Sequence, residues 1–172
     1  MAGKGLEALL ETVDLDPRLM LDIAGDGPDR ARLREIADAS GARNRITWVG
    51  HLTDRVTYLD RLAAADVFVF PSPAEGFPKV VLDAFAVGLP VVATRTGGLG
   101  ELADADLIEP IARPDAPAIA AALGALRARE PSEVVAQRDL AHAFASRHTR
   151  PAEAARLVEH WRRWWPDLPW EL

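Results

Sequence analysis

Two carboxylates and a lysine surround a predicted helix start in the stretch PSPAEGFPKVVLDAFAVG, residues 71–88. Glu75 lies in the loop before the helix, Lys79 at its entrance and Asp83 more than a turn inside it. The first N–H groups of a helix lack partners within the helix and carry partial positive charge, so they favour an anion such as phosphate. Lys79 adds a full positive charge, whereas Glu75 would repel phosphate and suits hydroxyl groups. The segment therefore indicates a ligand with phosphate and hydroxyl groups; the alternative is a helix start with a stabilising acid and a solvated Asp83.

Short apolar runs alternate with helical patterns up to about residue 110. The runs, bounded by Gly or Pro, predict strands at 19–25, 45–50, 66–70, 90–94 and 106–110. Segments with apolar residues three and four apart predict helices at 4–13, 29–41, 55–65 and 78–88. This alternation is typical of βαβ units, so the sequence predicts an α/β fold with a doubly wound parallel sheet and helices on both faces.

From residue 114 onward the pattern is helical, with helices predicted at 114–130, 131–148 and 151–165. A chain of 172 residues without a linker predicts a single domain, residues 1–172, made of an α/β core (1–113) and a helical C-terminal part (114–172). The last helix carries an apolar stripe, which we expect to pack on the domain. Because four of the five tryptophans lie between residues 161 and 170, the alternative is a stripe that covers a partner or meets a membrane edge. The stripe consists of Ala154, Leu157, Val158, Trp161, Trp164 and Trp165.

The composition excludes several classes of function. A formal charge of −6 argues against nucleic acid as the main partner, since phosphate binding requires a basic face. The chain has no cysteine, which excludes disulfides and thiolate sites, and its histidines lack metal-site spacing, so no metal site is predicted. The N-terminal segment is too charged for a signal peptide, and no apolar run reaches the ~18 residues of a membrane span. We therefore expect a cytoplasmic protein.

Three loops follow predicted strands and lead into predicted helices, at residues 25–30, 50–55 and 71–79. Ligands of open α/β sheets bind at this edge, beyond the carboxyl ends of the strands. Gly25, Gly27 and Gly50 permit positive φ and a close approach of the backbone to a ligand. Pro78 suits the first position of a helix, where no N–H is needed.

A longer stretch resembles the donor-binding signature of retaining glycosyltransferases of the GT-B fold, in particular glycosyltransferase family 4. This stretch reads VFVFPSPAEGFPKVVLDAFAVGLPVVATRTGGLGEL. The shared elements are a strand ending in Pro-Ser, then Glu-Gly-Phe, a second acid eight residues after the first, Gly-x-Pro-Val-Val-Ala-Thr and Gly-Gly-x-x-Glu. Three upstream blocks occur in the family's order and extend the resemblance over residues 4 to about 165. They read IAGDGPDRARL, ITWVGHL and LAAADVFVFPS. The resemblance implies the C-terminal, Rossmann-like half of a GT-B fold.

The resemblance also implies residue roles. Glu75 is similar to the family's ligand for the sugar hydroxyls at the catalytic centre. Asp83 stands where the family usually has Glu, which holds the ribose hydroxyls, so its shorter side chain predicts weakened or re-angled ribose binding. The backbone that lines the transferred sugar and the diphosphate is that of Gly76, Phe77, Pro78 and Lys79.

Further donor contacts follow from the upstream blocks. The loop near the base contains Gly50, His51 and Leu52, and the turn with Gly25 and Gly27 lies at the same edge. Lys4 matches the family lysine that pairs with the donor phosphates. The implied donor is a UDP- or GDP-linked sugar, and no cofactor or metal ion is expected.

One departure from the family lies at the N-terminus. Family members carry a strand ending in Gly-Arg just before the Lys-Gly, whereas three residues precede Lys4 here. In the strand order 3-2-1-4-5-6 that strand is central. We expect a sheet without it to close the gap, borrow a strand or be poorly stable, with apolar surface exposed and with a companion chain or homodimer that completes the fold. We expect the acceptor-binding domain that precedes this strand in the family to be absent as well.

These expectations lead to a donor-binding domain of a retaining glycosyltransferase, which transfers a hexose from a nucleotide sugar to an acceptor hydroxyl and is inactive or nearly so alone. One alternative is a non-catalytic nucleotide-sugar-binding module or subunit. Another is half of a nucleotide-sugar epimerase, but acid and base groups beyond Glu75 and Asp83 are not evident. A glycosidase fits poorly, because its two acids must flank one bond. A structural remnant of a truncated gene is the last alternative; nucleotide, sugar and acceptor stay open.

Overall fold

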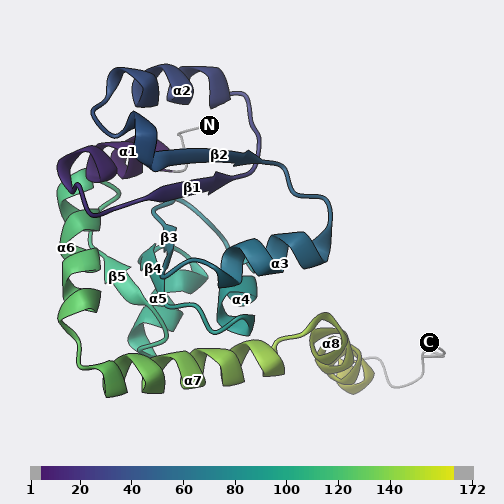
Figure 1. Cartoon of the computed structure of the whole chain (residues 1–172). Helices are drawn as coiled ribbons and strands as arrows, with labels where there is room; N and C mark the ends of the chain where they lie inside the picture. The colour runs from purple at the N-terminus through teal and green to yellow at the C-terminus, as the bar shows by residue number, and fades with distance from the viewer. Residues whose placement is uncertain (1–4, 165–172) are drawn as a thin grey trace.

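The computed structural model describes residues 5–164, which form five strands in two parallel sheets. In the first sheet β1 (Leu21–Ala24) pairs with β2 (Ile46–Gly50). In the second, β4 (Val91–Thr94) lies between β3 (Phe68–Phe70) and β5 (Glu109–Ile111). The five predicted strands and their parallel pairing are confirmed, but within these residues β1 and β3 do not pair, so the sheet is divided (Figure 1). Of the outcomes expected for a missing central strand, direct closure of the gap is therefore wrong.

Helices cover both faces of the divided sheet. One face carries α1 (Leu6–Leu15), α2 (Arg30–Ala39) and α6 (Ala116–Ala128), whose apolar residues form two clusters with β1, β4 and β5. The other carries α3 (Arg55–Ala63), α4 (Lys79–Ala86) and α5 (Gly98–Asp104). Outside α4 lies α7 (Pro131–Arg147), followed by α8 (Arg150–Trp164), and a short 3₁₀ turn at Arg43–Arg45 precedes β2 (Figure 1). The doubly wound α/β arrangement is confirmed.

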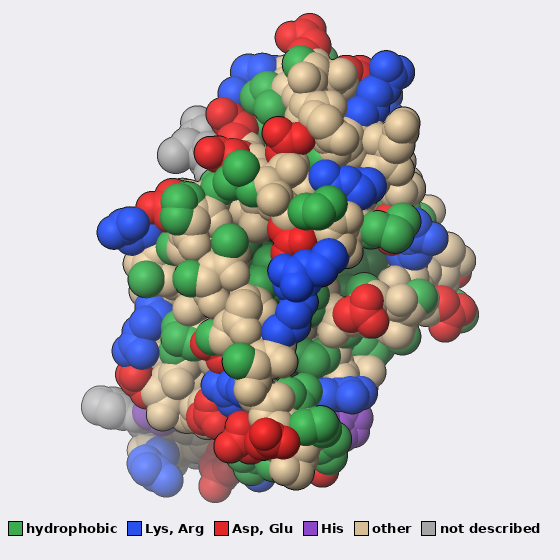
Figure 2. All heavy atoms as spheres, turned by 60° about the vertical axis from the view of Figure 1, so that its left-hand side comes forward, with side chains coloured by type: hydrophobic (Ala, Val, Ile, Leu, Met, Phe, Trp, Pro, Cys, Tyr) green, Lys and Arg blue, Asp and Glu red, His purple; other side chains and the backbone are tan. Residues whose placement is uncertain are grey.

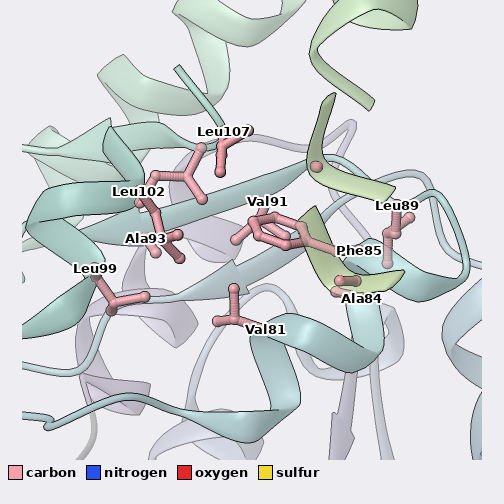
Figure 3. Packing of buried hydrophobic residues seen from close by; sticks show 12 residues of the cluster. Val81, Ala84, Phe85, Leu89, Val91, Ala93, Leu99, Leu102 and Leu107 are labelled. Atoms are coloured by element: carbon pink, nitrogen blue, oxygen red, sulfur yellow. The ribbon is translucent and has the colours of Figure 1, made fainter. Parts of the chain in front are cut away.

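The largest cluster of buried residues fixes α4 on the second sheet. Val81 and Phe85 of α4 are fully buried and lie beside Val91 of β4 and Leu99 of α5 (Figure 3). On its outer side the Phe85 ring meets Phe144 of α7 edge to face, with ring centroids 6.4 Å apart. Because α4 is held from both sides, its N-terminus has a fixed position at the carboxyl edge of β3.

The structure differs from the sequence expectations in three elements. Helix α5 was not predicted, since GLGELAD contains two glycines. The last strand begins at Glu109 rather than at residue 106, because Asp106 has φ 53° and the Leu107 N–H donates to the Leu102 carbonyl, so a turn closes α5 there. Helix α6 packs on β4, β5 and α1, which makes it part of the α/β layers.

The expectation that the stripe of the last helix packs on the domain is wrong for most of its described side chains, since Ala154, Leu157 and Trp161 are exposed and only Val158 among them is half-buried. Leu157 is 47% exposed and Trp161 is 40% exposed, and α8 lies beyond the end of α7, away from the sheets (Figure 1). The Trp164 side chain and Trp165 lie outside the described residues. Across residues 5–164 no helix combines the length and the apolar character needed to cross a bilayer. That the whole chain is one domain stays a prediction.

Candidate functional site

The predicted loops meet at one edge of the divided sheet. The Gly25 N–H, at the end of β1, donates to the Gly50 carbonyl at the end of β2 over 2.7 Å, and both glycines have positive φ, 127° and 77°. The loop after β3 lies across the gap, where Gly5 packs so closely on Pro71 that a Cβ would stand 2.1 Å from the Pro71 oxygen. The ends of β1, β2 and β3 thus border one cavity of about 1810 Å³.

Glu75 is positioned by Ser72, a residue of the same loop that is anchored to β4. The Ser72 hydroxyl donates to the Glu75 carboxylate over 2.9 Å, and Ser72 is itself buried, with 2% exposed. The Ser72 carbonyl accepts a hydrogen bond from the buried hydroxyl of Thr94, the last residue of β4. Glu75 is half-buried at the cavity wall. Its carboxylate is therefore oriented by Ser72 of its own loop, which Thr94 anchors to the second sheet.

The N-terminus of α4 opens on the same cavity. Pro78 is buried and forms the N-cap rather than the first helical position that the sequence predicted for it, and Lys79 is the first residue of the helix. Helix geometry leaves the N–H groups of Lys79 and Val80 without intrahelical partners. Glu75, Lys79 and Val80 all line the cavity. A carboxylate and a helix start with free N–H groups thus border the same cavity.

Asp83 is held by two residues of α3 that the sequence did not single out. Arg55 donates to both carboxylate oxygens, over 2.6 Å and 3.0 Å, and the Tyr58 hydroxyl lies 3.3 Å from one of them. Burial, and then the Asp83 carboxylate, raise the pKa of Tyr58 to about 12, and the hydrogen bonds to Asp83 raise the pKa of Arg55. Any ligand hydroxyl that uses Asp83 therefore competes with the Arg55 guanidinium.

Two glycines of the signature, to which the sequence assigned no role, hold the loop in place. The Gly98 N–H donates to the Gly76 carbonyl over 2.8 Å. Gly97 has φ 52° and packs so tightly that a Cβ would lie 2.0 Å from the backbone carbonyl oxygen of Glu75. Only glycine permits this approach, so the start of α5 sets where Glu75 and Gly76 lie. The Gly-Gly pair in the sequence was the available signal.

The structure gathers about half of the predicted donor residues on the cavity wall. Those that line it are Gly25, Gly27, Leu52, Glu75, Pro78 and Lys79. Those at the same edge that do not line it are Gly50, His51, Gly76, Phe77 and Asp83, and Lys4 lies outside the described residues. Basic and acidic side chains are mixed on the face in Figure 2, without one dominant basic area.

Comparisons with known proteins agree with this fold. The chain is 38% identical over 105 residues to the GDP-mannose-dependent alpha-(1-6)-phosphatidylinositol dimannoside mannosyltransferase of Mycobacterium tuberculosis, which covers 61% of this chain and 26% of that protein. Sucrose-phosphate synthase from Thermosynechococcus elongatus superposes with a TM-score of 0.78 and 25% identity, over 96% of this chain and 43% of that one. HepE from Anabaena, solved in complex with UDP, superposes with a TM-score of 0.74 and 21% identity, over 91% and 44%.

This chain therefore spans less than half the length of these three proteins. Its α/β fold is that of half of a GT-B glycosyltransferase, as predicted. The model of the family described as Glycosyl transferases group 1 matches residues 2–129, which include all five strands and the helices that position Glu75 and Lys79. The chain belongs to the glycosyl transferases group 1 family.

Proposed function

We propose that this chain is the donor-binding domain of a retaining glycosyltransferase. It binds a nucleotide sugar and presents the hexose for transfer to an acceptor hydroxyl. The observation that carries the proposal is that Glu75, held by Ser72, and Lys79 at the α4 N-terminus line the same cavity. These groups match the two parts of a nucleotide sugar, because one accepts from hydroxyls and the other binds phosphate.

The proposed chemistry assigns each group one task. In the transfer, the bond between the anomeric carbon and the diphosphate oxygen breaks, and an acceptor hydroxyl oxygen bonds to that carbon on the same face. The hydroxyl proton passes to the departing diphosphate. Lys79 and the α4 amides stabilise the negative charge that develops on the diphosphate, and Glu75 holds the hexose through its hydroxyls. We expect no metal ion to be required.

Both named nucleotides have precedent among the similar proteins. The mycobacterial relative is GDP-mannose-dependent, and HepE was solved with UDP. Because a base recognised through backbone atoms leaves no side-chain signature, UDP- and GDP-sugars are both candidates for this chain. The cytoplasmic location, a companion chain or homodimer, and a peripheral membrane contact through α8 stay predictions.

The isolated chain is proposed to bind its donor without efficient turnover. Placing the acceptor requires groups beyond this half of the fold, since a transferase must hold both reactants in line. A non-catalytic nucleotide-sugar-binding subunit would use the same cavity. A turnover assay with a supplied N-terminal half separates the two, because only the transferase gains activity.

The test is a thermal-shift and calorimetric panel of UDP, GDP and their hexose conjugates. A true donor at 100 times its Kd should stabilise the chain by about 2.7 kcal/mol. Glu75→Gln should weaken the nucleotide sugar at least about tenfold and leave the bare diphosphate nearly unchanged, because a charge-assisted hydrogen bond to the sugar is lost. Lys79→Ala should weaken both ligands, whereas Glu159→Gln, on exposed α8, serves as the control. The proposal fails if no member of the panel stabilises the chain, or if Glu75→Gln binds the sugar conjugate like the control.

A further inference from the structure

Helix α7 ends at an elbow, and α8 continues from it at an angle, away from the sheets (Figure 1). Among the described side chains of α8, those of Ala152 and Val158 are half-buried and the others are exposed. A helix of 15 residues with so little packing is marginal by itself, because most helical stability in proteins comes from a buried face. The position of α8 therefore depends on the contacts at the elbow.

His148, the residue that closes α7, lies at the centre of the elbow. Its backbone N–H donates to the Ala145 carbonyl over 3.1 Å, and its Nδ1 lies 2.8 Å from the Phe144 carbonyl oxygen. The imidazole ring stacks on the ring of Phe144, with centroids 3.8 Å apart and an angle of 16° between the ring planes. Phe144 in turn meets Phe85 of α4 edge to face. The imidazole is thus held in one orientation at the end of α7.

The hydrogen bond to Phe144 determines which nitrogen of His148 carries a hydrogen. A carbonyl oxygen can only accept, so Nδ1 is the donor, and in the neutral imidazole Nε2 is left with a lone pair. This Nε2 lies 4.0 Å from a carboxylate oxygen of Glu153, in the first turn of α8. A lone pair and a carboxylate do not attract each other, whereas a protonated Nε2 and a carboxylate form an ion pair. A proton on His148 therefore strengthens the contact between the two helices.

The other groups at the elbow both add to this gain and limit it. The Phe144 ring and the last carbonyls of α7 favour a cation, since cations are stabilised on an aromatic face and at a helix C-terminus. Arg147 and Arg156 carry the same charge as a protonated imidazole and disfavour it. Arg156 also pairs with Glu153 and donates to the Arg147 carbonyl over 2.8 Å, so it shares the carboxylate with His148. We therefore expect a moderate effect of the proton rather than a large one.

We propose that His148 is a proton-dependent latch between α7 and α8. Histidine is the side chain that ordinarily changes charge between about pH 5 and 8. With His148 protonated, its ion pair with Glu153 holds α8 at the angle seen in Figure 1. With His148 neutral, the ion pair is lost and α8 opens more often, which changes where its exposed Leu157 and Trp161 are presented. The latch goes beyond donor binding and does not depend on it.

The test measures the local opening of α8 by hydrogen exchange in the full 172-residue chain. Rates are expressed as protection factors, so that the pH dependence of intrinsic exchange is removed. Amides of residues 154–163 should be about twofold to fivefold more protected at about pH 5.5 than at about pH 8, which is the gain expected for one cation at an exposed helix end. Amides of residues 135–144, in α7 before the elbow, serve as the internal reference and should show a smaller change.

Four variants separate the groups involved. His148→Gln can still donate to the Phe144 carbonyl but does not titrate, so it should lose the pH dependence. Glu153→Gln keeps the size of the side chain and removes its charge, so it should lose most of the pH dependence. His160→Gln removes the other histidine of α8 and should keep it. Glu75→Gln, which should weaken the nucleotide sugar, should also keep it, so the latch and the donor proposal fail separately.

Each other result overturns the latch. Equal protection of α8 at both pH values, or stronger protection at the higher one, would show that the proton does not hold the helix. A pH dependence that persists in His148→Gln or disappears in His160→Gln would assign the titration to another group. An unchanged pH dependence in Glu153→Gln would show that the carboxylate is not the partner of the imidazole.

Discussion

Replacing Gly97 by alanine tests whether the start of α5 positions the donor loop. Gly97 has φ 52° and ψ −136°, a conformation that costs an alanine roughly 1–3 kcal/mol. The new Cβ would lie 2.0 Å from the backbone carbonyl oxygen of Glu75, whereas real Cβ contacts stay above 3.0 Å. The loop that contains Glu75 must therefore move by about 1 Å. A displacement of this size at a site that requires exact geometry can change function by about a hundredfold.

The matched control is Gly100→Ala, three residues further along the same helix. Nothing lies within 4 Å of its added Cβ, so the substitution should stabilise the chain by roughly 0.5–1 kcal/mol through helix propensity. Urea unfolding measures the stability of both variants, and calorimetry measures the affinity for the sugar donor found in the panel. We expect Gly97→Ala to lower stability by about 1–3 kcal/mol and affinity by at least about tenfold. Equal behaviour of the two variants in both assays would refute the reasoning.

Three further predictions concern other parts of the chain. Arg55→Ala frees the Asp83 carboxylate from its ion pair, so calorimetry should show that this variant binds a nucleoside diphosphate more tightly than the wild type. Asp83→Asn should bind the same ligand more weakly than the wild type. The opposite order of affinities would contradict the ribose role proposed for Asp83. Phe85→Ala should lower the free energy of unfolding by about 3–5 kcal/mol, because the ring is fully buried, and an unchanged urea midpoint would contradict this packing. The Arg113 guanidinium, and then the Ala118 N–H, hold the pKa of the Asp115 carboxyl below its usual value. The unfolded state therefore takes up the proton first as the pH falls, and stability should drop between about pH 5 and 3, with a smaller drop in Asp115→Asn.

Much of the fold was readable because its signals are local. Apolar runs bounded by Gly or Pro marked all five strands, and the three and four spacing of apolar residues marked α1 to α4 and α6 to α8. Helix α5 was not predicted, because Gly98 and Gly100 weaken the helical pattern; Gly98 and the preceding Gly97 pack against the loop of Glu75. The stripe of α8 was visible, but whether a stripe is covered depends on what packs against it.

The candidate site was predictable in position but only partly in contacts. The loop after β3 and the start of α4 lie where the sequence placed them, and Glu75 and Lys79 line one cavity. The ion pair between Arg55 and Asp83 joins residues 28 positions apart, so no local sequence pattern predicts it. It adds a competing cation to the expectation that Asp83 holds ribose hydroxyls.

The sequence by itself determined the kinds of element, their order and the edge at which the candidate ligand-binding loops gather, since periodicity and glycine or proline act over a few residues. Only the tertiary structure decided that the sheet is divided between β1 and β3, that Thr94 supports the Glu75 loop through Ser72, and that Gly97 limits its position. These features depend on backbone distances between segments far apart in the chain. Such distances follow from how the helices pack on both faces, which no single stretch of residues encodes.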